Sequence, residues 1–260
     1  MKIRHFELLK QIRQLNLNSI AEAYEILGER LEWEYNGKDP KINDQWKMIF
    51  SKINYLNEKI TQNSKTVKTM DEIRDKFQRI KTDTDKKLDI NLTPKIIITP
   101  HREKENLGTC TQQKAGKNRY KYTIGITEGL CEPKCENVIV HEYAHVINRE
   151  TIKLWDWASE GFAQGIAKLC PPSKLSLAVA LMGQSSKLLS FEKDALKLAS
   201  KYEELSQNKI EKHELGEAIF AVLENEIGNG IYPQLYKNFT PIDELICLSQ
   251  FNSDLLQILK

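Results

Sequence analysis

The chain has 260 residues, of which 40% belong to the hydrophobic set and 28% are charged. This composition supports a packed core and excludes a disordered chain, and the length fits one or two domains. The net charge of +2 is spread evenly along the chain, so we expect no nucleic-acid partner.

The amino terminus, Met1 to Glu7, carries charges where a signal peptide would need an apolar stretch. The longest apolar run, residues 175–182, is too short to cross a bilayer. We therefore expect a soluble, cytoplasmic protein that does not bind membranes. The sequence does not indicate an oligomeric state.

Residues 1–90 are predicted to form a helical N-terminal region. Apolar residues recur at helical spacing over 6–31, 42–60 and 70–80. The almost wholly polar segment 81–87 is predicted to be a solvated turn.

The remaining residues, 91–260, are predicted to form a second domain that begins with a small sheet. The β-branched segment 94–100 predicts a short buried strand, and 101–118 predicts a polar loop. Alternating apolar and polar residues predict a half-exposed strand over 120–127. A helix is expected to begin near Glu136, and the chain after residue 172 is expected to be helical. The expected fold class is therefore α+β and mostly helical.

The segment His141-Glu142-x-x-His145 contains two of the five histidines of the chain. On a helix these histidines lie on one face, about 6 Å apart along the axis, so both can bind one zinc ion. Glu142 lies about 100° around the helix, where it can accept a proton from a metal-bound water and act as general base.

A zinc site with three protein ligands needs one more donor, which should come from a second helix packed on the first. Glu160 is that donor in our prediction, because small neighbours, Gly161 and Ala163, allow the helices to approach closely. The alternative is that Glu160 merely lies in a first helical turn capped by Ser159.

The His141-Glu142-x-x-His145 segment followed by Trp157-Ala158-Ser159-Glu160-Gly161-Phe162-Ala163 resembles the gluzincin metallopeptidases, especially the aminopeptidase family and the short peptidase MA-like domains. The resemblance implies a zincin-like catalytic domain with a small sheet before the HExxH helix and a helical C-terminal part. It implies Zn²⁺ as the cofactor, a peptide or protein substrate, and the ligand and base roles given above. No G-x-M-E-N motif precedes the helix, so the resemblance does not extend to recognition of a free amino terminus.

Supporting positions have functional and structural interpretations. Gln164 is either a partner that orients one imidazole or a helix-packing residue. The strand 120–127 lies where gluzincins place an edge strand that binds extended substrate. Trp155 and Trp157 are expected to be core contacts that position the third ligand.

The five cysteines, an odd number in a large chain, favour reduced thiols over a disulfide framework. Cys131 and Cys135 flank a proline before the zinc helix. A second metal site with Cys110 or Cys170, and a local disulfide, remain alternatives.

His213 is the candidate second catalytic residue. The segment Lys212-His213-Glu214-Leu215-Gly216 resembles the aminopeptidase P-Y-E-K-G segment, with His213 at the position of the tyrosine. The resemblance implies that His213 donates a hydrogen bond to the oxyanion, and Tyr232 is the next candidate.

We therefore expect a zinc metallopeptidase. Two alternatives remain open: a catalytically silent zinc-binding interaction module, and a regulatory peptidase dedicated to one protein partner. The sequence does not distinguish an endopeptidase from an exopeptidase.

Overall fold

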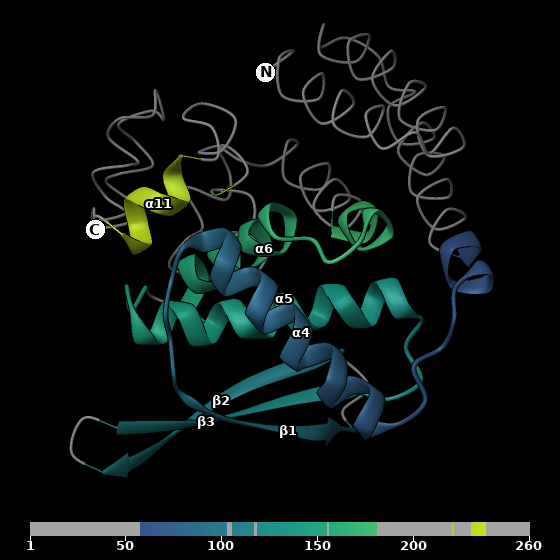
Figure 1. Cartoon of the computed structure of the whole chain (residues 1–260), viewed down its shortest axis with the longest axis horizontal. Helices are drawn as coiled ribbons and strands as arrows, with labels where there is room; N and C mark the ends of the chain where they lie inside the picture. The colour runs from purple at the N-terminus through teal and green to yellow at the C-terminus, as the bar shows by residue number, and fades with distance from the viewer. Residues whose placement is uncertain are drawn as a thin grey trace, which may run out of the picture. The chain divides into compact units, whose positions relative to one another are not determined.

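The computed structural model of the chain describes residues 58–102, 106–116, 119–154, 156–180, 220 and 230–237, without the side chains of 156 and 157. The chain divides into two units, Met1–Ser64 and Lys65–Lys260. All elements discussed below belong to the second unit, which is α+β as predicted (Figure 1). They are α4 (Met70–Leu88), β1 (Lys95–His101), β2 (Gly108–Gly116), β3 (Arg119–Thr127), α5 (Glu132–Glu150), α6 (Asp156–Leu169) and α11 (Ile231–Tyr236).

Helix α4 corrects the expected turn at 81–87. The helix begins at a capping box, in which Thr69 and Glu72 each accept a backbone hydrogen bond from the other, and continues to Leu88. Thr84 and Leu88 are buried, so the polar end of the helix still has a core-facing side. Since α4 packs on α5 and β1, it belongs to the unit that contains the candidate site.

The sheet has three strands in the order β1-β3-β2, with β1 parallel and β2 antiparallel to β3. Strand β3 is therefore central, and the prediction that it is a substrate-binding edge strand is wrong. Residues 108–116, predicted as part of a loop, form the edge strand β2. Most of β2 is exposed on both faces, so its sequence lacks the apolar alternation by which strands are recognised.

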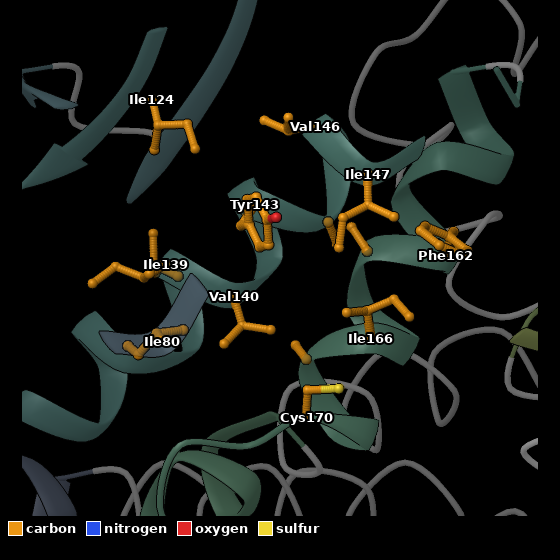
Figure 2. Close-up of a cluster of buried hydrophobic side chains, with 14 of the residues drawn as sticks. Ile80, Ile124, Ile139, Val140, Tyr143, Val146, Ile147, Phe162, Ile166 and Cys170 are labelled. Carbon is orange, nitrogen blue, oxygen red and sulfur yellow. The ribbon is translucent and has the colours of Figure 1, made fainter. Parts of the chain in front are cut away.

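Helix α5 begins at Glu132, one turn earlier than predicted, because Pro133 suits the first turn of a helix, where a backbone N–H has no helical acceptor. It is buried on most sides, since α4 and the sheet cover one side and α6 covers another. Figure 2 shows the resulting core, in which apolar side chains of α5 meet those of its neighbours. The neighbouring side chains include Ile80 of α4, Ile124 of β3, and Phe162 and Ile166 of α6.

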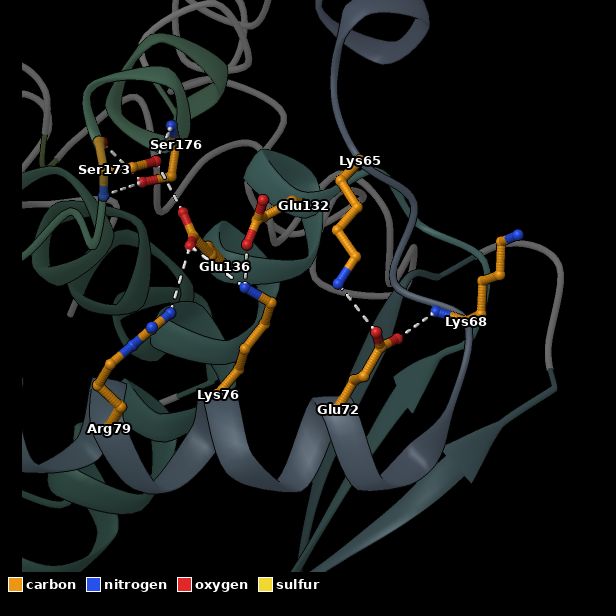
Figure 3. Close-up of polar contacts among 9 residues, drawn as sticks. All are labelled: Lys65, Lys68, Glu72, Lys76, Arg79, Glu132, Glu136, Ser173 and Ser176. Atoms are coloured by element: carbon orange, nitrogen blue, oxygen red, sulfur yellow. Dashed lines mark hydrogen bonds and ion pairs between the residues drawn. The ribbon is translucent and has the colours of Figure 1, made fainter.

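A buried carboxylate fixes the first half of α5 against two other segments (Figure 3). Glu136 is 5% exposed. Its carboxylate lies 3.7 Å from Lys76 Nζ and 3.8 Å from Arg79 Nη2, both of α4. Ser173, just before the helical segment 174–180, donates a 2.7 Å hydrogen bond to it. Because a buried charge without partners is costly, these contacts hold α5 in one position.

Within the described residues, no helix combines the length and the apolar character that a membrane span requires.

Candidate metal centre

Helix α5 carries both predicted histidine ligands on one face, as the spacing of four residues requires. The rings of His141 and His145 meet edge to face, with centroids 5.0 Å apart. His145 is buried and His141 is half-buried. The pair is therefore held at the edge of the core, where His141 remains partly exposed.

Helix α6 brings Glu160 against both rings. Its carboxylate oxygens lie 3.2 Å from His141 Nε2 and 3.4 Å from His145 Nε2. Zinc bonds of about 2.0–2.1 Å would place tetrahedral donors about 3.3–3.4 Å apart, so these separations fit one ion. Among the described residues, this trio is the one group of three or more metal-binding side chains whose donor atoms all lie within 4.8 Å of one another.

The connection between α5 and α6 is built around Asn148, which the sequence analysis did not identify. Its backbone carbonyl accepts hydrogen bonds from Ile152 and Lys153, and its side-chain oxygen accepts one from Leu154 N at 2.9 Å. Lys153 takes the left-handed conformation with φ 58°. This tight turn returns the chain so that α6 packs directly on α5.

Ser159, and not the candidate Gln164, is the hydrogen-bond partner of His145. The serine oxygen lies 2.8 Å from His145 Nδ1 and accepts a 2.8 Å hydrogen bond from Asn148 Nδ2. Gln164 instead donates to the carbonyl of Ala180. Since α6 begins at Asp156, Ser159 is not a helix cap, and its side chain is available to orient the imidazole.

Glu142 is 6% exposed and lies beside the edge strand β2. A Cβ on Gly108 would be 2.8 Å from Glu142 Oε1, so the backbone of β2 passes directly over this carboxylate. Burial raises the pKa of Glu142 above its ordinary value, and the Glu160 carboxylate adds to the rise. The two histidines and Arg149 oppose it. Glu142 is thus placed near the trio without being one of its members.

The backbone of β2 presents a free edge beside Glu142. Thr127 N donates to Leu107 O, which identifies 107 and 127 as a hydrogen-bonded pair. Because such pairs alternate in an antiparallel ladder, Gly108 and Cys110 direct their backbone groups away from β3. In the described part of the chain no strand pairs with that edge.

The second oxyanion candidate, Tyr232, is a core residue. Its ring is fully buried and packs against Phe162 and Phe220. Its hydroxyl lies 1.6 Å from where a Cβ on Gly165 would be, so α6 accommodates the ring only because it has glycine there. The first candidate, His213, and Trp155 lie outside the described residues, as does the side chain of Trp157.

The four cysteines within the described part of the chain form no disulfide, and none joins a metal-binding cluster there. They are Cys110, Cys131, Cys135 and Cys170.

Comparisons with protein families, curated proteins and solved structures found no match for this chain.

Proposed function

We propose that the chain is a zinc-dependent metallopeptidase with a zincin-like catalytic domain. The observation that carries the proposal is the convergence of His141, His145 and Glu160, with donor separations of 3.2 and 3.4 Å, beside a buried fourth residue, Glu142. Two imidazoles and one carboxylate form a common ligand set of catalytic zinc, which keeps one position open.

Each residue has a distinct task in this proposal. Zinc, when bound, polarises a substrate carbonyl and lowers the pKa of water to about 7. Glu142 accepts the proton of the attacking water and later delivers it to the leaving amine. Ser159 keeps His145 Nδ1 hydrogen-bonded, so that Nε2 faces the ion.

The free edge of β2 would bind an extended peptide through backbone hydrogen bonds. Gly108 brings this edge against Glu142, and Cys110 continues it toward the end of α5. A peptide along this edge would present its carbonyl groups beside the ligand trio. A zinc-binding module without turnover would not need a buried carboxylate at Glu142, so its placement favours the peptidase.

The test is cleavage of an unfolded, reduced and alkylated protein by the zinc-loaded chain, followed by mass spectrometry. Glu142→Gln should lower the rate by about 10²–10⁴-fold, the range expected for a lost general base. Glu128→Gln, at an exposed glutamate before α5, is the matched control and should retain the wild-type rate. Equal rates in all three proteins would overturn the proposal.

A further inference from the structure

Arg149 lies on the same face of α5 as Glu142. The two residues are seven positions apart in the sequence. Seven positions correspond to a rotation about 20° short of two full helical turns and to a rise of about 10 Å along the axis. Arg149 Nη1 donates a 3.0 Å hydrogen bond to the carbonyl of Cys110. Strand β2 therefore runs along α5: Gly108 lies beside Glu142, and Cys110 lies beside Arg149.

In the described part of the chain no carboxylate lies within ion-pair distance of Arg149, although Glu142, on the same face of α5, feels its charge. The other contact of Arg149 is Cys110 Sγ at 3.2 Å, and burial raises the pKa of that thiol to about 12, so the sulfur is uncharged at neutral pH. Among the described ion pairs none involves Arg149. The side chain is half-buried, and a partly desolvated guanidinium without a carboxylate favours an anion.

The contact with Cys110 occupies part of the guanidinium only. Arginine has five N–H donors arranged in a planar fork, which matches the two oxygens of a carboxylate. The Cys110 carbonyl, which accepts this hydrogen bond, also belongs to the outer edge of β2, with which no described strand pairs. Consider a peptide that pairs along this edge with one of its residues beside Gly108. The position two residues along the peptide, roughly 7 Å away, would then bring a side chain or the peptide terminus to Arg149.

We propose that Arg149 recognises a carboxylate of the substrate about two residues from the bond that lies beside Glu142. The proposal rests on the peptidase function above and adds the substrate class to it. The carboxylate comes from an aspartate or glutamate side chain or from the carboxyl terminus of the peptide. The two sources would make the protein an endopeptidase with acidic preference or a carboxypeptidase-like enzyme, respectively.

The test uses zinc-loaded full chain and synthetic nonapeptide libraries with a fixed central glutamate or glutamine, each as free acid and as amide. The wild type should prefer the carboxylate-bearing member of one pair by about 10- to 100-fold in kcat/KM, as one charge-assisted contact predicts. Glutamate over glutamine identifies a side chain, and acid over amide identifies the terminus. Mass spectrometry of the products gives the distance from the cleaved bond.

Arg149→Gln should abolish this preference, and Arg149→Lys should retain part of it, because lysine keeps the charge without the fork. The matched control is Arg74→Gln, at an exposed arginine of α4, which should keep the wild-type ratio. If Arg149 only joins β2 to α5, its substitution will slow all peptides equally. An unchanged ratio in Arg149→Gln, or no preference in the wild type, would overturn the proposal.

A binding measurement separates this proposal from the peptidase proposal. Fluorescence anisotropy of labelled libraries with zinc-loaded Glu142→Gln reports recognition without turnover. Carboxylate-dependent binding that Arg149→Gln removes supports the role of Arg149 even if the wild type cleaves nothing. Cleavage without any charge preference overturns the role of Arg149 and leaves the peptidase function standing.

Discussion

The hydroxyl of Ser159 offers a test of how the site holds its metal. Ser159→Ala removes an oxygen that lies 2.8 Å from His145 Nδ1 and 2.8 Å from Asn148 Nδ2. His145 is 7% and Asn148 2% exposed, so water does not readily replace the lost contacts. Each buried polar group left without a partner costs about 1–3 kcal/mol, so we expect the free energy of unfolding to fall by at least about 2 kcal/mol.

The zinc affinity should fall as well, because the imidazole of His145 is no longer held with Nε2 toward the ion. Loss of such an orienting contact typically lowers metal affinity by about 10–100-fold, which corresponds to about 1.4–2.7 kcal/mol of binding free energy. Competition with a chromophoric chelator measures this affinity directly. Urea unfolding of the metal-free protein measures the stability separately.

Ser176→Ala is the matched control. Ser176 is 1% exposed, and its hydroxyl donates to Ser173 O and accepts from Ser173 N, away from the ligand trio. We expect this variant to lose stability while binding zinc like the wild type. If Ser159→Ala also binds zinc as tightly as the wild type, the orienting role of Ser159 is refuted.

Two further variants test the neighbourhood of Glu142 and the cap of α4. Gly108→Ala should lower kcat at nearly unchanged zinc content, because the new Cβ would lie 2.8 Å from Glu142 Oε1 and force the strand or the carboxylate to move. Steady-state kinetics and elemental analysis measure the two quantities, and a wild-type kcat in this variant would contradict the prediction. Glu72→Gln should lower stability at neutral pH, because hydrogen bonds from the backbone of Lys68 and the side chain of Lys65 hold the pKa of Glu72 at about 2, below its unfolded value of 4.5. That stabilisation is present above about pH 4.5 and is lost as the pH falls toward 2, so the difference from the wild type in urea unfolding should shrink over this window. A difference independent of pH would refute this argument.

The sequence predicts the elements that have a buried face and a regular period. The apolar positions of α5 and the spacing of His141 and His145 follow from helical geometry, so the ligand face could be predicted. The end of α4 and strand β2 could not, because few of their side chains are apolar. In α4 a capping box and contacts with α5 maintain the helix, and in β2 the ladder to β3 maintains the strand.

The contacts that orient the site depend on how the chain returns between α5 and α6. Asn148 lies one turn after His145, and Ser159 directly precedes Glu160, but their meeting requires the turn at Lys153. Nothing in the local sequence pattern encodes that meeting. The same reason explains why Gln164, one turn after Glu160 on α6, was a plausible partner and yet donates elsewhere.

The zinc content of three purified proteins tests the central claim most directly. By elemental analysis, wild type and Glu142→Gln should each hold about one zinc per chain, because Glu142 handles a proton and is not a ligand. His145→Ala should lose most of its zinc, since it removes one of three donors from the ion. Equal zinc loss in Glu142→Gln and His145→Ala, or no zinc in the wild type, would contradict the account.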